Sequence, residues 1–190
     1  VHLGGLLLLL GGGVTALFSS EGNMVIAEGE TSNHVDDYFD MELAFVNTSR
    51  HDSLEYTVFD APLLNDGNSI TYEDFGIQID IISHMENVRI ESRISPAEKI
   101  YKGFLKEFVL LPLRPEKEAT QNRPGIIIKL SGLSSEKDGI YGIFLGQKTP
   151  DTFQINGDLY FTEFRRKRTY LPFSISLLDF EKIMHPGTNV

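Results

Sequence analysis

The chain has 190 residues, of which 41% are hydrophobic and 23% charged, a length that predicts one domain with a buried core. Its net charge of −10 argues against a general nucleic-acid-binding protein, because contacts with phosphates need clustered basic residues. The absence of cysteine excludes disulfides, thiolate metal sites, cysteine nucleophiles and the Cys-x-x-Cys-His motif of haem attachment.

Residues 1–18 form an apolar run without any Asp, Glu, Lys or Arg. As a helix, 18 residues would extend roughly 27 Å, close to the ~30 Å hydrocarbon core of a bilayer. We therefore predict a transmembrane helix within residues 1–20, truncated at its start because the chain begins with Val1. A secretory signal peptide is the main alternative, although the run lacks a basic start and ends in a poor cleavage site. A buried core helix is the other alternative.

The stretch from residue 21 to residue 49 contains seven acidic residues and no Lys or Arg. Cytoplasmic flanks of spanning helices are rich in Lys and Arg, so this stretch predicts an extracytoplasmic position for the following domain. Its Asp36, Asp37 and Asp40 are candidate calcium ligands. The order and the glycine of the known calcium loop are absent, which favours a solvated acidic linker.

Beyond the apolar run, hydrophobic and polar residues alternate with the period of two that is typical of half-buried strands. Turn sequences separate these segments, and Asn156-Gly157 predicts a tight hairpin. We predict a mainly β, antiparallel domain over residues 21–190, truncated at its end and without a strong internal boundary. Its expected strands are 39–45, 54–59, 76–81, 88–92, 125–130, 139–145, 152–155, 159–164 and 173–177.

One helix is expected within this β domain, over residues 95–108. Ser95, Pro96 and Glu98 form a capping box with proline in the first turn, and apolar residues then recur at helical spacing. Pro112 is expected to stop the helix, and residues 114–124 are expected to form a polar loop.

The histidines do not have the spacing of a metal site. Asp80 and His84 are predicted to share one strand face, where a carboxylate could orient an imidazole as in a secreted hydrolase. A structural histidine is the favoured interpretation, because the nucleophile and phosphate-binding motifs of hydrolases and nucleotide enzymes are absent.

The only dense basic run is Arg165-Arg-Lys-Arg168, with aromatic residues on both sides. Its position favours a solvated hairpin turn. The alternative is a patch that binds an acidic protein partner or membrane headgroups rather than nucleic acid.

His2 differs from the other histidines because it lies in the apolar run. An ionisable residue within a membrane segment is costly, and its presence indicates a function. Imidazole is a common axial ligand of haem iron, which makes His2 a candidate haem ligand. An interfacial histidine is the alternative if the helix ends just upstream.

Three segments together carry a resemblance to a known family. The first is Val1-His-Leu-Gly4, which opens an apolar run that leads into residues 21–30 with their Glu-Gly and Gly-Glu pairs. The second is Asp74-Phe-Gly-Ile-Gln-Ile79, and the third is Leu171–Phe180, with its Leu-Pro-Phe and Leu-Asp-Phe, followed by His185-Pro-Gly-Thr188. They resemble the ResB (CcsB) family of System II cytochrome c biogenesis.

The resemblance implies an inner (plasma) or thylakoid membrane protein whose β-rich domain lies on the extracytoplasmic side. It implies membrane lipid, a haem-handling membrane protein of the ResC or CcsA type and apocytochrome c as partners, and no nucleic acid. The complex would move haem across the membrane and act as a cytochrome c synthetase, whereas this chain alone is not expected to be an enzyme. His2 matches the family's transmembrane axial haem ligand, with haem bound transiently and none expected in the isolated outer domain. The rival hypothesis is a membrane-anchored β-domain binding module without haem.

Overall fold

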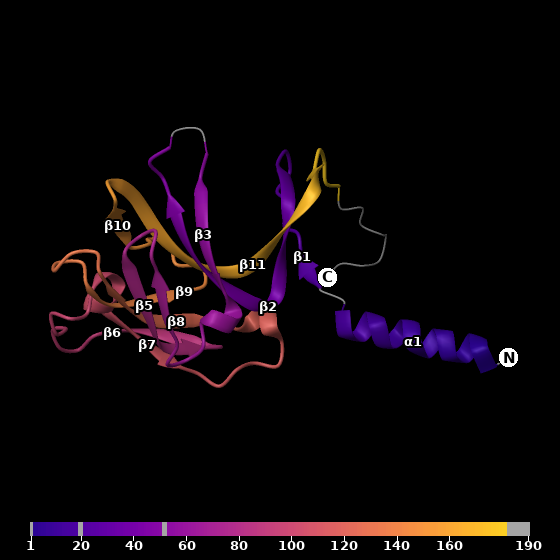
Figure 1. Cartoon of the computed structure of the whole chain (residues 1–190), viewed down its shortest axis with the longest axis horizontal. Helices are drawn as coiled ribbons and strands as arrows, with labels where there is room; N and C mark the ends of the chain where they lie inside the picture. Colours follow the sequence, from indigo (N-terminus) through magenta and orange to yellow (C-terminus); the bar gives the residue numbers. More distant parts are fainter. Residues whose placement is uncertain (1, 19–20, 51–52, 182–190) are drawn as a thin grey trace, which may run out of the picture. The chain divides into compact units, whose positions relative to one another are not determined.

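The computed structural model describes residues 2–18, 21–50 and 53–181, and for His2 and Phe18 it describes the backbone alone (Figure 1). Strands make up 49% of the structure and helices 14%. The predicted mainly β fold with antiparallel sheets is therefore confirmed.

The chain divides into two compact units. Unit 1 consists of Val1–Tyr38 and Arg168–Val190, and unit 2 consists of Phe39–Lys167. The two longest strands, β2 (Thr31–Asn47) and β11 (Asp158–Ser176), contribute residues to both units.

Unit 1 begins with the helix that the sequence predicts within residues 1–20, α1 (His2–Phe18). Its leucines are largely exposed, and a Cβ added at any of its five glycines would meet no neighbouring atom within 4 Å. Among the described residues, none of the helices combines the length and the apolar character needed to cross a membrane.

The strands form three sheets. In the first, the order is β1-β2-β11-β10, and β3 also pairs with β2. In the second the order is β4-β5-β8-β9, and β6 pairs with β7 in the third. The remaining bounds are β1 (Gly22–Asn23), β3 (Glu55–Asp60), β4 (Ser69–Tyr72), β5 (Ile77–Met85), β6 (Val88–Ser92), β7 (Phe108–Pro112), β8 (Gly125–Ser131), β9 (Gly139–Phe144) and β10 (Thr152–Ile155).

These strands match the segments predicted from alternation except for single residues at four ends, and residues 159–164 and 173–176 belong to the single strand β11. The predicted hairpin joins β10 to β11. Asn156 and Gly157 have φ angles of 55° and 94°, which are the left-handed conformations that a two-residue hairpin turn requires.

Unit 2 has one main core between two layers. One layer is formed by β2, β10 and β11 and the other by β5, β8 and β9. Every second side chain of these strands points into the space between the layers, where it is buried. Phe45, Ile79, Ile128 and Phe153 are among the largest of these fully buried side chains.

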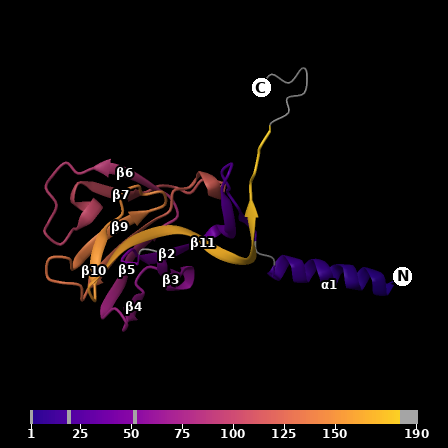
Figure 2. The ribbon, with the colours of Figure 1, turned by 90° about the horizontal axis from the view of Figure 1, so that it is seen from above.

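A second, smaller core lies on the other face of the β8-β9 pair. Leu105 and Leu110 are buried there with Met85 and Val88, and Phe104 and Phe144 are partly buried against them. The β6-β7 pair and the short 3-10 helix η2 (Gly103–Lys106) supply this layer, and Figure 2 shows β6 and β7 at one side of the unit, near β9. The other short helices are η1 (Ala61–Leu63) and η3 (Ala119–Gln121).

The predicted helix over residues 95–108 is wrong. Ile100 O accepts a hydrogen bond from Ile140 N at 2.8 Å, and Lys102 N donates to Ile140 O at 2.9 Å, so this backbone pairs with β9. Gly103 then takes a left-handed φ of 50°, which an α-helix cannot continue through. Only the single turn of η2 remains of the helix, and Phe108 begins β7.

Candidate functional site

The basic run lies inside β11, so the prediction of a solvated hairpin turn at residues 165–168 is wrong. Arg165 is buried, and its Nε lies 2.7 Å from Glu42 Oε1 on β2. A second nitrogen of Arg165 lies 3.0 Å from Glu163 Oε2. Burial by itself would lower the pKa of Arg165, but the hydrogen bond with Glu42 and the charge of Glu163 raise it above its ordinary value.

The other three basic residues of the run also contact groups within their own units. Arg166 donates to the backbone oxygens of Phe39 and Ala119 at 3.2 and 3.0 Å. Lys167 Nζ lies 3.4 Å from Asp60 Oδ2, and Arg168 Nε lies 3.2 Å from Asp36 Oδ1. The run therefore has partners inside the protein.

The acidic residues predicted to form a linker lie in a strand instead. Asp36 and Asp37 pair with β1, and all three aspartates, including Asp40, belong to β2. The linker interpretation is wrong because strand pairing and an ion pair with β11 hold this stretch in place. Over residues 2–18, 21–50 and 53–181, no cluster of three His, Asp or Glu residues is arranged to hold a metal ion.

Asp80 and His84 lie on opposite faces of β5. A bulge between Ile81 and Ser83 shifts the register, so that Asp80 faces Lys129 while His84 faces Ile126 in the core. Asp80 accepts hydrogen bonds from Gln78 and Ser69, which lower its pKa, and burial lowers the pKa of His84. Asp80 therefore does not orient His84, and the predicted hydrolase pair is absent.

Of the remaining histidines, the structure describes only the side chain of His34. His34 lies on β2, with its ring centroid 5.8 Å from that of Tyr170, and not on α1. His51 and His185 fall outside the described residues. His2 lies in the first turn of α1, but its side chain is likewise not described. The donor chemistry of imidazole fits an axial haem ligand, and the open surface at the α1 glycines leaves room for a partner group.

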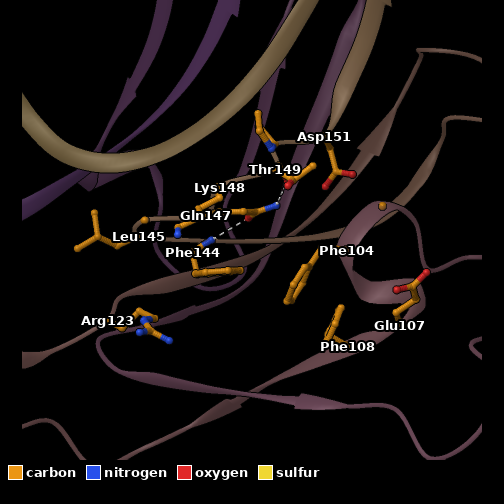
Figure 3. A pocket seen from close by; sticks show the side chains of 13 residues that line it. Phe104, Glu107, Phe108, Arg123, Phe144, Leu145, Gln147, Lys148, Thr149 and Asp151 are labelled. Atoms are coloured by element: carbon orange, nitrogen blue, oxygen red, sulfur yellow. Dashed lines mark hydrogen bonds between the residues drawn. The ribbon is translucent and has the colours of Figure 1, made fainter.

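Unit 2 contains a pocket of about 680 Å³ (Figure 3). It has the size of a small-molecule site. Its floor is made by three phenylalanine rings: those of Phe104 and Phe108 are stacked with centroids 4.7 Å apart, and Phe144 lies 5.1 Å from Phe104.

Charged groups lie at both sides of these rings. Figure 3 shows Arg123 and Lys148 on the side of Phe144, with Glu107 and Asp151 on the side of Phe104. Within the described residues, neither Arg123 nor Lys148 has a carboxylate partner for its side chain. The pocket therefore combines an apolar floor with two cations that are available to an anion.

The loop over residues 145–150 that bounds the pocket is organised by one side chain. Gln147 Nε2 donates to Thr149 O at 3.0 Å, and Gln147 Oε1 accepts from Phe144 N at 3.4 Å. These bonds give the loop an internal framework, which fixes the pocket wall beside the rings.

Asp151 closes the other side of the pocket against η2. Its carboxylate accepts a hydrogen bond from the backbone of Phe104, while Oδ2 is buried without a partner in the described residues. Burial raises the pKa of Asp151, because the charged form has lost water. A Cβ at Gly103 would collide with this carboxylate, so the contact requires glycine.

Asp151→Asn is expected to stabilise the protein at neutral pH. Because the folded-state pKa of Asp151 lies above its unfolded value, ionisation costs stability as the pH rises through the folded-state pKa, and the amide removes this cost. The gain should shrink as the pH falls toward the unfolded value. The difference between the urea unfolding midpoints of the two proteins, measured between pH 7.5 and 4.5, gives the gain in stability. A gain that grows as the pH falls would contradict the prediction.

Sequence reasoning missed this pocket because it assigned Phe104 and Phe108 to the apolar face of a helix. Gly103 in the middle of that segment was the available signal, since glycine weakens a helix interior. Phe144 was expected in a strand, but which face of that strand meets the other rings depends on the tertiary structure.

The chain is a mainly antiparallel β protein with an aromatic-lined pocket. Comparison with protein-family models finds no matching family, and comparison with curated proteins finds no matching relative. The resemblance to the ResB family therefore depends on the residue motifs themselves.

Proposed function

We propose that this chain is part of a System II cytochrome c assembly protein, which helps to move haem across a membrane and to present it to apocytochrome c. In this proposal α1 belongs to a membrane-spanning helix of the inner (plasma) or thylakoid membrane. The β units lie on the extracytoplasmic side, and a haem-handling membrane protein of the ResC or CcsA type is the partner.

The observation that carries the proposal is the pairing of two segments that resemble the family and lie far apart in the sequence. Gly29 N donates to Leu177 O at 2.7 Å, and Leu177 N donates to Glu30 O at 3.0 Å. Beside them, the hydroxyls of Thr31 and Ser176 are 2.7 Å apart. The Gly-Glu pair and the Leu-Pro-Phe segment thus form one structural element of unit 1, which supports treating them as one motif.

The apolar surface of α1 also supports the proposal. Leu3, Leu8 and Leu17 are each at least 75% exposed, and residues of this kind need lipid or another helix to cover them. Haem is the cargo in this proposal. His2 would hold its iron from one side, and the second ligand would come from another helix or from the partner.

His2→Ala in the full-length complex tests the function. Loss of an axial ligand is expected to lower the haem that copurifies with the complex by about tenfold or more, since even residues that only support a metal ligand change affinity by that factor. Haem absorbance of the purified complex and the yield of mature cytochrome c measure the result.

His34→Ala is the matched control, because His34 lies on β2 beside Tyr170 and away from α1 in the sequence. It should leave haem content unchanged. If His2→Ala changes neither haem absorbance nor maturation, the proposal fails and a membrane-anchored binding module without haem becomes the better description.

A further inference from the structure

We infer that the pocket of unit 2 binds a planar, apolar ring system that carries carboxylates at one edge. The binding follows from the pocket alone, whereas its use in handling a porphyrin depends on the function proposed above. The pocket is distinct from His2, which lies in unit 1.

The aromatic surface of the pocket favours a ligand that is itself a ring system. The rings of Phe104 and Phe108 are stacked on each other, at 13° with centroids 4.7 Å apart, and that of Phe144 is inclined at 57° to Phe104. All three phenylalanines are only partly buried, so the pocket leaves aromatic surface in contact with water. Covering such surface with another ring system is favourable, and aromatic rings stack in offset or tilted arrangements.

The charges of the pocket favour carboxylates on that ligand. The Arg123 guanidinium offers paired donors that match a carboxylate, and Lys148 offers a second positive charge on the same side. On the opposite side, Glu107 is exposed and Asp151 accepts its hydrogen bond from the backbone of Phe104. If all the carboxylates of the ligand are at one edge, that edge can contact Arg123 and Lys148. The other, uncharged edge then lies on the side of the acidic residues and brings no negative charge near them.

The lining residues also indicate that a metal ion at the centre of the ligand would not change its affinity for the pocket. None of the described residues of the pocket is His, Met or Tyr, so none supplies the usual axial ligands of haem iron. Binding through stacking and ion pairing should be the same for a metal-free porphyrin and for its iron complex. Equal binding of the two porphyrins would distinguish the pocket from a site that binds haem through its iron.

Free-base protoporphyrin IX, a planar dicarboxylate, is the probe. The full chain is reconstituted in lipid nanodiscs, with empty nanodiscs as the blank, and porphyrin fluorescence anisotropy measures binding. We expect saturable binding of the free acid. Its dimethyl ester, which has the same ring and no negative charge, should bind about tenfold more weakly, because charge-assisted hydrogen bonds to Arg123 are lost.

Two variants are expected to weaken binding of the free acid. Phe104→Leu keeps an apolar side chain but removes the ring, and should weaken binding about fivefold to tenfold. Arg123→Gln changes an exposed side chain and should weaken binding of the acid without affecting the ester, a result that does not depend on refolding. Phe173→Ala and Arg89→Gln, both exposed and outside the pocket, are the matched controls and should bind as the unmodified chain does.

Equal binding of the acid and the ester would overturn the inference, because Arg123 and Lys148 would then make no contribution to binding. Binding that neither Phe104→Leu nor Arg123→Gln alters would overturn it too, since the probe would then sit in lipid or on α1. If this inference fails while His2→Ala still abolishes haem retention, the proposed function stands. If the pocket binds porphyrin but His2→Ala has no effect, the proposed function fails.

Discussion

Replacing Arg165 by Met is expected to destabilise unit 2 by about 3–5 kcal/mol, because it breaks the buried ion pair between Arg165 and Glu42. Both side chains of this pair are about 5% exposed or less, so water cannot replace the lost contact. The substitution also removes the contact between the Arg165 guanidinium and the Tyr56 ring, 4.7 Å from its centroid. Urea-induced unfolding followed by tyrosine fluorescence, with amide exchange in β5 and β8, measures the loss.

Two comparisons test whether the loss has this cause. The double variant Glu42→Gln with Arg165→Met removes both charges, and should recover part of the lost stability. Lys167 lies on the same strand as Arg165, but its ion pair with Asp60 is exposed. Lys167→Met should therefore lower the free energy of unfolding by no more than about 1 kcal/mol. Equal effects of Arg165→Met and Lys167→Met would show that burial of the pair is not what matters.

Phe45→Ala is expected to destabilise unit 2 by about 3–5 kcal/mol, because it opens a cavity at the centre of the main core. Phe45 is fully buried, and its ring has centroid distances of 6.0, 6.2 and 6.3 Å to those of Phe59, Phe75 and Phe153. These neighbours come from β3, β10 and the segment before β5, so one side chain joins both layers. The same urea unfolding experiment measures the effect.

Phe45→Leu should cost less than Phe45→Ala, since leucine refills most of the space but removes the ring contacts. Phe173→Ala makes the same chemical change in unit 1 at a side chain that is 56% exposed, and should alter stability by about 0.5 kcal/mol or less. A Phe45→Ala protein as stable as Phe173→Ala would show that the core does not depend on this ring.

The sequence predicted strands well because a half-buried strand leaves a period of two that each segment shows by itself. The alternation in residues 76–81 and 152–155 needs no knowledge of the partner strand, and β5 and β10 are found there. The Asn156-Gly157 hairpin was equally predictable, because its turn depends on the conformations of two adjacent residues.

Two of the failed predictions show how a distant partner decides the local structure. Residues 95–108 have a good helix start, but Ile140 binds the backbone on both sides of Tyr101, and the left-handed φ of Gly103 prevents an α-helix from continuing through it. The run at 165–168 looks like an exposed turn by its charges alone. Glu42 lies far away in the sequence, and only the pairing of β2 with β11 shows that Arg165 is buried beside it.

By itself, the sequence determined the apolar helix over α1 and the antiparallel β class. These features depend on composition, on period and on neighbouring residues. Only the tertiary structure decided that Asp80 and His84 face opposite ways, that the basic run has partners, and that Phe104, Phe108 and Phe144 share one pocket. The physical reason is that bulges, strand pairing and ring contacts depend on which distant segments become neighbours when the chain folds.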